Sequence, residues 1–486
     1  MTIGVVIGKA STQRATVFVF QEAKTRVGQH VILEHDEGIL GLITSVITDS
    51  PVLDDNTSDE GLVKDLIFKK YEIIKYRKAR VKLLCKLKDL TLPDSPPPPG
   101  TRVRLALDDE LTTIFSNGNI RIGTLIRKNV EVKIDVNAVA RHLAILAATG
   151  AGKSNTVAVL SSRIAEKGGT VIIFDYHGEY YNSDIKNLNV IEPKINPLYL
   201  EPDELATLLE IKVNVAHIQS RIIRKAFKEV KEEIEGMIKS GSLSLGMLNT
   251  QFLVMLKEKV EELRKNEKRE KVAEVLNKIE EFGDRYSNII SLAVGDIVGR
   301  IMRGKVNVVN LRLLSGNAVD AVVSHYLRRI LEARKEYNEG KHGLQFPVFV
   351  VIEEAHVLLS KNKYTLTKYW AGTIAREGRK FGVGLVIVSQ RPKGIDVEIL
   401  SQMTNKIILR MIEPTDKKYI LGASDNLSED MVKSISSFND GEALIVGNIV
   451  KIPTVVKIDK FEGKLGGGNP NMLGQQEDYS DVLDWG

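Results

Sequence analysis

The sequence predicts an α/β core with a parallel sheet, preceded by a small β-barrel and interrupted by a helical bundle. Short β-branched runs fill residues 1–90, and apolar runs of strand length alternate with helical stretches from about residue 140. Residues 201–300 have almost no strand signal. We therefore place the barrel at 1–90, the core at 91–460 with the bundle at 201–300 inserted in it, and a C-terminal arm at 461–486.

Closely spaced β-branched runs without a helical period predict the barrel. Its expected strands are 3–7, 15–20, 30–33 and 39–47. Apolar and basic residues alternate over 67–87, which predicts a further strand pair with one face in water. The proline-rich segment 93–100 is either a stiff linker or a rigid turn inside a domain, and we take it as the domain edge.

The inserted segment is rich in charge. In stretches such as 228–235, charged faces accompany apolar residues at helical spacing. This pattern favours the solvated faces of a helical bundle over a dedicated binding surface. Strand-like residues resume at 306–311, so we expect the bundle to lie between two strands of the sheet.

Composition excludes several classes of protein. A single cysteine among 486 residues rules out an internal disulfide and a cysteine-based metal cluster within one chain. The net charge of +5 permits nucleic-acid binding without demanding it. The apolar runs fall far short of the roughly 20 residues that a membrane-spanning helix needs. The start of the chain lacks a signal-peptide pattern, so we expect a cytoplasmic protein with no membrane partner.

The strongest motif lies between a buried strand at 143–147 and a helix that ends near residue 166, and it is Thr149-Gly150-Ala151-Gly152-Lys153-Ser154. Its glycines let the backbone curl so that N–H groups face phosphate oxygens, and the helix N-terminus adds positive charge. Lys153 is expected to reach the β- and γ-phosphates and Ser154 to ligate Mg²⁺. Ala147 replaces the first glycine of the P-loop pattern, and alanine fits there if that residue is still extended.

A second apolar run, 346–352, is followed directly by Glu353 and Glu354. Successive residues of a strand face opposite ways, so the two carboxylates can have different roles. We expect Glu353 to hold Mg²⁺ through water and Glu354 to polarise the attacking water. The alternative is a pair of exposed carboxylates at a strand end.

Polar residues also follow other core strands. Gln390 ends the run 383–390, where its amide can sense the γ-phosphate or orient water, although glutamine there is often a turn residue. Asp175 ends the strand 170–175, and contact with Mg²⁺ or its water and plain turn formation both stay open. Arg379 precedes a strand, where it either complements a helix dipole or reaches the ATP of a neighbouring subunit.

Five groups of residues together resemble the HerA–FtsK group of P-loop ATPases, most closely its archaeal HerA members. They are 141–146 with 149–155, 175–180, 353–356, 376–380 and 389–392. The resemblance covers nearly the whole chain and implies a RecA-like core with an N-terminal barrel and a helical insertion. It further implies a homohexameric ring that pumps double-stranded DNA with ATP. Such rings act with the NurA nuclease in DNA end resection for recombination, and the barrel is the expected docking collar for NurA.

Carried onto these positions, the resemblance makes Arg379 the leading arginine finger in trans and Arg141 a weaker candidate for a nucleotide contact. It also brings Asn155 into the nucleotide-binding motif. Candidate DNA-contacting groups of the channel lie in sheet-edge loops, such as Lys361 to Lys368. The predicted catalytic residues are Glu354, Glu353, Lys153, Gln390 and Arg379, and the predicted metal ligands are Ser154, Glu353 and Asp175. The predicted cofactors are ATP and Mg²⁺.

Two rival functions stay open on these residues. One is a secretion or conjugation ATPase at a membrane, which the short apolar runs disfavour. The other is a nucleotide-dependent switch in which ATP only rearranges the barrel as a partner-binding module. A translocase should hydrolyse ATP faster with DNA, whereas a switch should turn over slowly and not respond.

Overall fold

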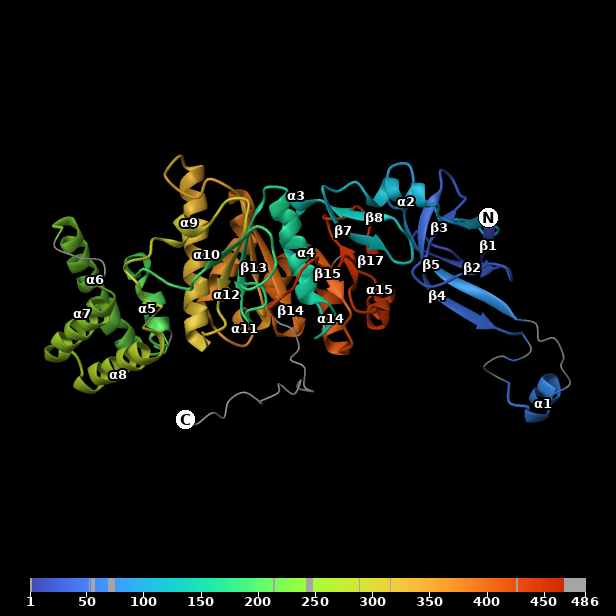
Figure 1. Ribbon diagram of the computed structural model, residues 1–486. Helices are drawn as coiled ribbons and strands as arrows, with labels where there is room; N and C mark the ends of the chain where they lie inside the picture. The colour runs from blue at the N-terminus through green and yellow to red at the C-terminus, as the bar shows by residue number, and fades with distance from the viewer. Residues whose placement is uncertain are drawn as a thin grey trace, which may run out of the picture.

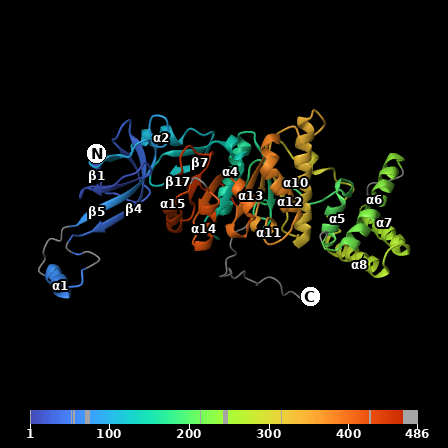
Figure 2. The same cartoon turned by 180° about the vertical axis from the view of Figure 1, so that it is seen from behind.

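Three structural parts follow one another along the molecule in the computed structural model. Figure 1 shows the inserted helices at one end, the α/β core in the middle and the barrel at the other end, and Figure 2 shows the same order from behind. The described residues are 2–51, 53, 57–68, 75–212, 215–241, 248–287, 289–314, 316–424 and 427–466. Most of the predicted C-terminal arm, 461–486, lies outside them.

The N-terminal part is a closed barrel with the strand order β1-β2-β5-β4-β3-β6. Its strands are β1 (Thr2–Ile7), β2 (Arg14–Val19), β3 (His30–Leu33), β4 (Ile39–Asp49), β5 (Tyr76–Lys86) and β6 (Arg102–Leu105). Alternate side chains such as Val17, Val31 and Val81 fill its interior. The predicted barrel is confirmed.

Of the strand pair expected over 67–87, the described residues contain one strand. That strand is β5, and it pairs with both β2 and β4. The chain before it forms α1 (Glu60–Phe68), where apolar residues recur at helical spacing. Residues 69–74, the rest of the expected first strand, lie outside the described residues.

The barrel also extends past the expected edge near residue 90, because β6 comes after the proline-rich segment. That segment is held against the barrel by backbone hydrogen bonds. The N–H of Gly100 donates to the carbonyl of Val6 at 2.8 Å, and the N–H of Val6 donates to the carbonyl of Thr101 at 2.9 Å. The prolines therefore belong to a rigid turn inside the barrel, which is the other reading that the sequence allowed.

The core is an 11-stranded sheet of order β11-β12-β10-β13-β14-β9-β15-β16-β17-β7-β8. The first seven strands of this order, from β11 through β9 to β15, are parallel to one another. The pairs from β15 onwards are antiparallel. The predicted strands are β9 (Leu143–Leu146), β10 (Thr170–Asp175), β12 (Val306–Asn310), β13 (Val348–Ile352) and β14 (Val383–Ser389). The unpredicted ones are β7 (Ile120–Leu125), β8 (Glu131–Ile134), β11 (Leu188–Ile191), β15 (Asn405–Leu409), β16 (Glu442–Val446) and β17 (Thr454–Ile458).

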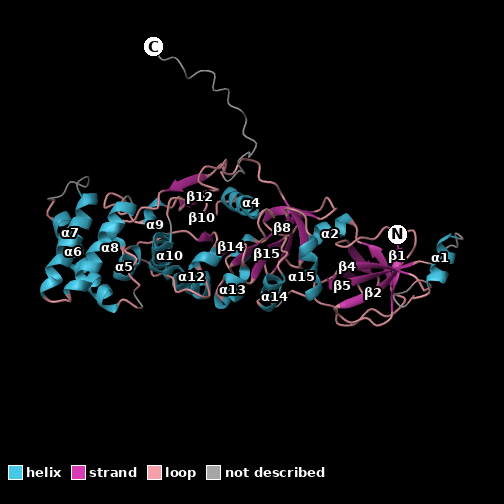
Figure 3. Ribbon diagram, turned by 90° about the horizontal axis from the view of Figure 1, so that it is seen from below, coloured by secondary structure: helices cyan, strands magenta, loops and turns pink. Residues whose placement is uncertain are grey.

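Helices cover both faces of the parallel strands, as Figure 3 shows from below. On one face, Ile145 and Ile173 share a core cluster with Val157 of α4 (Lys153–Glu166). On the other face, Phe174 lies 6.2 Å, between ring centroids, from Tyr326 of α10 (Gly316–Asn338), beside α12 (Leu366–Glu377). Strands buried on both faces need continuous apolar runs, which is why these strands were recognisable in the sequence.

The insertion is helical, as predicted, and lies in the chain between β11 and β12. It comprises α5 (Pro202–Leu208), α6 (His217–Lys239), α7 (Leu248–Glu262) and α8 (Arg269–Tyr286), followed by α9 (Ile297–Arg300). A buried ion pair fixes its base to the core, because Arg328 of α10 donates to Glu204 of α5 at 2.8 Å. In the part of the chain that the structure describes, no helix is long and apolar enough to cross a membrane.

Smaller helices complete the fold. They are α2 (Asp108–Phe115), α3 (Val136–Val139), α11 (Ala355–Leu358), α13 (Val397–Gln402), α14 (Pro414–Gly422) and α15 (Glu429–Ser434). Residues of α2 share a core cluster with barrel strands and with β7 and β8, the last two strands in the order of the sheet. The barrel is therefore packed onto the antiparallel end of the sheet, far from the inserted bundle.

Candidate ATP site

The P-loop has the backbone that its sequence predicts. Gly150 and Gly152 have φ angles of 76° and 103°, in the left-handed region that glycine adopts without steric cost. Ala147 follows β9 directly, and its N–H donates to the carbonyl of Ser389 at 3.2 Å. Because Ala147 still pairs with the neighbouring strand and its methyl group is fully buried, alanine fits where the pattern has glycine.

Lys153 begins α4, and its ammonium group donates to a carboxylate oxygen of Glu354. The contact joins the P-loop to the end of β13, so the two strongest motifs of the sequence meet at one point. Lysine has three donors, so this contact leaves two for phosphate oxygens.

The side chains of Glu353 and Glu354 point in different directions, but not because successive residues of a strand alternate. β13 ends at Ile352, and both glutamates lie in the turn after it. Glu354 has φ 45° and ψ 42°, a left-handed conformation that is uncommon for a residue with a side chain. This backbone turn separates the two carboxylates. Strain of this kind is typical of functional sites.

Glu353 is almost completely buried, with 1% of its surface exposed. The hydroxyl of Tyr180 donates to its Oε1 at 2.8 Å, whereas its buried Oε2 has no hydrogen-bond partner among the described residues. Burial raises the pKa of Glu353 to about 8, against the opposing effect of the nearby Lys153 charge. A cation near Oε2 would lower that pKa again.

Glu354 is buried as well, with 3% exposed, but it has several partners. Its Oε1 also lies 3.5 Å from Nε2 of His177, and its Oε2 lies 3.2 Å from Nδ1 of His356. A carboxylate held by Lys153 at one oxygen and near a histidine at the other is well placed to orient a water molecule.

Gln390 bridges the same groups. Its Oε1 accepts from the hydroxyl of Thr149 in the P-loop at 2.6 Å, and its Nε2 donates to Oε2 of Glu354 at 3.5 Å. A residue that served only as a turn would not need both contacts. They support the predicted role of Gln390 as a sensor or orienter between phosphate and water.

Asp175 is fully buried and organises the loop after β10. Its Oδ1 accepts from the N–H groups of Gly178 and Glu179, and its Oδ2 accepts from those of Tyr180 and Tyr181, all at 2.9–3.0 Å. Four donors fill the lone pairs of a carboxylate, so these contacts support turn formation over a metal role. Asp175 as a metal ligand stays a prediction that the geometry does not favour.

Ser154 and Glu353 fit Mg²⁺ by their chemistry. The described residues contain no group of three or more His, Cys, Asp or Glu side chains able to hold a metal ion. Mg²⁺ commonly takes only one or two protein oxygens and completes its shell with water and phosphate. The Ser154 hydroxyl and the unpartnered Oε2 of Glu353 are oxygens of that kind. When bound, the ion neutralises charge on the phosphate oxygens.

The predicted arginines lie at the other edge of the sheet. Arg141 stands two residues before β9, and Arg379 lies in the short helix η3 (Gly378–Phe381) before β14. The P-loop and the glutamates follow the carboxyl ends of β9 and β13. β9 alone, at about 3.3 Å per residue, puts Arg141 roughly 13 Å from its own P-loop. This geometry does not favour Arg141 as a contact of its own chain's nucleotide, and the nucleotide contact of Arg141 stays a prediction.

Arg379 and Arg141 are both exposed, and so is Arg376 at the end of α12. Within the described ranges, their side chains make no hydrogen bond or ion pair. Between them lies His142, whose pKa is lowered to about 4 by burial, with a further contribution from the charge of Arg379. The three guanidinium groups thus lie on one exposed edge.

Asn155 contacts the chain itself. Its side-chain N–H donates to the carbonyl of Asp459 at 2.8 Å, and its Oδ1 accepts from the N–H of Phe461 at 2.8 Å. Both ends of the amide are used to hold residues 459–466, here called the C-terminal strap, across α4. The predicted nucleotide contact of Asn155 is not supported by this geometry.

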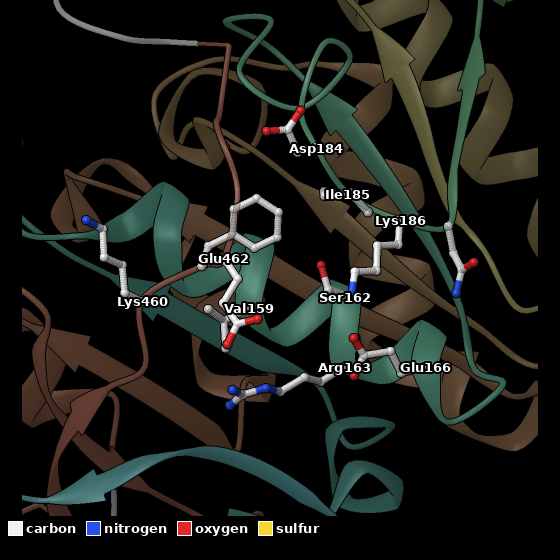
Figure 4. Close-up of a pocket in the computed structure, with 11 residues that line it drawn as sticks. Val159, Ser162, Arg163, Glu166, Asp184, Ile185, Lys186, Lys460 and Glu462 are labelled. Carbon is white, nitrogen blue, oxygen red and sulfur yellow. The ribbon is translucent and has the colours of Figure 1, made fainter.

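The strap closes a cavity of about 200 Å³ on the outer side of α4, shown in Figure 4. Ser162, Arg163 and Glu166 of α4 line it, with Lys460 and Glu462 of the strap opposite. The strap also meets the loop after β10, because the N–H of Gly466 donates to the carbonyl of Glu179 at 2.8 Å.

Sequence reasoning missed Tyr180, His177 and His356 as parts of the site. The motifs that contain them were recognised, but only their acidic members were given roles. The available signal was position, since 175–180 and 353–356 both follow core strands and a parallel sheet brings such segments together.

Fold and site together define a P-loop ATPase with an N-terminal barrel. The family model "Helicase HerA, central domain" matches residues 120–330, and the model "HAS barrel domain" matches residues 3–89. Two proteins named DNA double-strand break repair helicase HerA, from Sulfolobus acidocaldarius and Sulfurisphaera tokodaii, are 59% and 60% identical over 100% of both chains. The chain belongs to the HerA family and is an ATP-hydrolysing DNA helicase.

Solved structures agree on the fold of the core. VirB4 of Thermoanaerobacter pseudethanolicus matches with a TM-score of 0.51 at 18% identity, covering 72% of this chain and 98% of that one. The bacterial conjugative coupling protein TrwB matches with a TM-score of 0.50 at 14% identity, covering 73% and 92%. At these identities the match shows a shared fold only.

Proposed function

We propose that the chain forms a homohexameric ring that uses ATP and Mg²⁺ to move double-stranded DNA through its channel. In this proposal it acts with a NurA nuclease in resecting DNA ends, during double-strand break repair by homologous recombination. Full-length similarity to proteins named DNA double-strand break repair helicase HerA supports the repair role.

One observation supports the proposed ring assembly. The phosphate-binding loop and the carboxylates lie at one edge of the parallel sheet, and Arg379 lies exposed at the other. A transition state with spread negative charge needs more cations than Lys153 and one Mg²⁺ supply. Arg379 cannot reach its own site, but in a ring of copies each arginine edge faces the next subunit's ATP. Closed rings of this kind use head-to-tail interfaces.

The loop after α11 supports contact with DNA. Lys361 and Lys363 are exposed there, and Tyr364 is 60% exposed beside them. Lys368 differs, because its ammonium group donates to the carbonyls of Ser360 and Lys363 at 2.9 and 2.6 Å. Lys368 therefore closes the loop, and the DNA-contacting candidates narrow to Lys361 and Lys363. Their contacts would be with phosphates and so indifferent to base sequence.

The barrel is the proposed docking collar for the nuclease. It lies at the opposite end of the molecule from the inserted bundle, with the ATPase core between them. Deleting the barrel strands should weaken co-purification with NurA and leave basal ATP hydrolysis partly intact. Unchanged nuclease binding would overturn this part of the proposal.

The central test is the rate of ATP hydrolysis with and without long duplex DNA, together with the mass of the assembly. Stimulation by duplex DNA and a hexameric mass are expected. DNA affinity should fall linearly with salt on a log–log plot, and Lys363→Ala should reduce that slope by about 1 for each phosphate contact that is lost. Slow turnover that ignores DNA would instead favour a nucleotide-dependent switch.

A further inference from the structure

The loop after β10, residues 175–181, is placed against the end of β13 by the sheet itself. β10 and β13 are parallel neighbours, with Phe174 opposite Ile352. Asp175 follows Phe174 as the last residue of β10, and Glu353 follows Ile352 in the turn after β13. From this loop the hydroxyl of Tyr180 reaches Glu353, at 2.8 Å from Oε1.

The loop is also held in one conformation. Four backbone N–H groups donate to the buried carboxylate of Asp175, which fixes the backbone at Tyr180 and Tyr181. Tyr180 has no exposed surface, and its ring lies in the apolar cluster that α4 shares with the sheet. A phenol hydroxyl held in this place can donate to the carboxylate of Glu353.

We propose that Tyr180 is a positioning residue for the metal-side carboxylate: its hydroxyl holds Oε1 of Glu353 so that Oε2 faces the Mg²⁺-bound water. This inference rests on the proposed role of Glu353. Two observations support it: the 2.8 Å hydrogen bond from Tyr180 to Oε1, and the burial of Oε2 without a hydrogen-bond partner among the described residues. A buried oxygen without a hydrogen-bond partner is unfavourable, so a partner is expected there.

A purely structural role of Tyr180 would require its ring but not its hydroxyl. The ring of Tyr180 fills space in the core, and phenylalanine would fill the same space. Only the hydroxyl reaches Glu353, and groups that orient metal ligands in this way typically contribute about 10- to 100-fold to metal affinity or activity. Removing the oxygen alone therefore separates packing from positioning.

The experiment compares full-length Tyr180→Phe with Tyr181→Phe, a matched change in the same loop at a tyrosine with no contact to Glu353. A fluorescent ATP analogue is titrated with and without Mg²⁺, and turnover is measured across a MgCl₂ series. For Tyr180→Phe we expect unchanged binding without Mg²⁺, a roughly 10-fold or greater rise in the Mg²⁺ needed for half-maximal binding, and a lower kcat. Tyr181→Phe should match the wild type.

Wild-type Mg²⁺ dependence in Tyr180→Phe would overturn the inference, and thermal unfolding checks that the variant is folded at the assay temperature. A Glu353→Gln variant distinguishes failure of the proposed role of Glu353 from failure of the proposed role of Tyr180. If Glu353→Gln keeps full turnover, the role of Glu353 itself fails. If Glu353→Gln is inactive while Tyr180→Phe is normal, only the role of Tyr180 fails. The double variant should be no worse than Glu353→Gln alone, and an additive loss would contradict action through Glu353.

Discussion

The charged side chains at the two edges of the parallel sheet differ in burial and in hydrogen bonding. At the carboxyl edge, Asp175, Glu353 and Glu354 are buried, and each accepts hydrogen bonds from its own chain. At the amino edge, Arg376 and Arg379 are exposed, and their side chains pair with nothing in the described part of the chain. Apart from Oε2 of Glu353, the charged groups of the carboxyl edge find their partners within one molecule, and those of the amino edge do not.

The difference follows from the cost of burial. A buried polar group without a partner is expensive, so a fold keeps one only where partners are supplied. An exposed guanidinium is solvated and costs nothing to leave alone. The role of a group whose partners lie in the same chain can therefore be recognised from the structure of one chain. A group that needs a second chain has no visible partner there.

The largest expected effect comes from removing the arginine of the amino edge. Arg379→Ala should assemble and bind ATP, because its side chain supports nothing in the described fold, yet turnover should fall by about 10³–10⁵. The measurement is ATP hydrolysis at a concentration where the mass confirms assembly. Arg376→Ala is the matched control on the same edge and should lose much less.

Mixing variants tests whether Arg379 acts across subunits. Lys153→Ala subunits cannot bind phosphate properly but still carry Arg379, and Arg379→Ala subunits keep an intact P-loop. Interfaces that join the two in that order should recover part of the turnover that each variant lacks alone. Mixed rings of confirmed mass without any recovery would count against Arg379 and move the role to Arg376 or Arg141.

The next effect in size belongs to the carboxyl edge. Glu354→Gln should bind ATP normally, because the amide still occupies the same space, but hydrolysis should fall by about 10²–10⁴ since an amide cannot act as a base. Nucleotide affinity and single-turnover rate measure the two parts separately. Near-normal turnover would assign the base role to Glu353 instead.

The carboxyl edge was largely predictable from sequence, because each of its parts is a short local pattern. The P-loop between β9 and α4, the glutamates after β13 and Gln390 after β14 all follow apolar runs that mark buried parallel strands. Tyr180 was not predictable in its role, because its hydrogen bond to Glu353 spans 173 positions of the chain.

Other failures of prediction have local causes. Asn155 follows Ser154 in the motif, but each residue of a helix turns by about 100°, so its side chain points to the strap and not to the phosphates. β16 and β17 are antiparallel strands added at the side of the sheet, separated from the predicted core by short helices. Arg141 lies close to the P-loop in the sequence, but β9 separates the two in space.

The smallest expected effect concerns His142, which holds the amino edge together beneath Arg379. Its Nδ1 accepts from the N–H of Leu385 at 2.9 Å, which ties the start of β9 to β14. Its pKa is about 4 in the folded chain, against about 6.5 when unfolded, mainly because of burial. Between these values the unfolded chain binds more protons. Stability should therefore be complete above pH 6.5 and decrease as pH falls towards 4, by about 3 kcal/mol at most from this residue.

Urea unfolding at pH 7.5 and pH 4.5 measures this loss of stability. His142→Asn should reduce it, because asparagine does not titrate, its Oδ1 can accept from Leu385, and it tolerates the φ of 66° found at this position. His30 in the barrel is the matched control, since burial lowers its pKa to about 4 as well. His142→Asn and His30→Asn should each remove part of the loss of stability between pH 7.5 and pH 4.5. Because only His142 lies beneath Arg379, only its replacement should alter the pH dependence of DNA-stimulated turnover. An unchanged loss of stability in His142→Asn would show that this histidine does not link protonation to the amino edge.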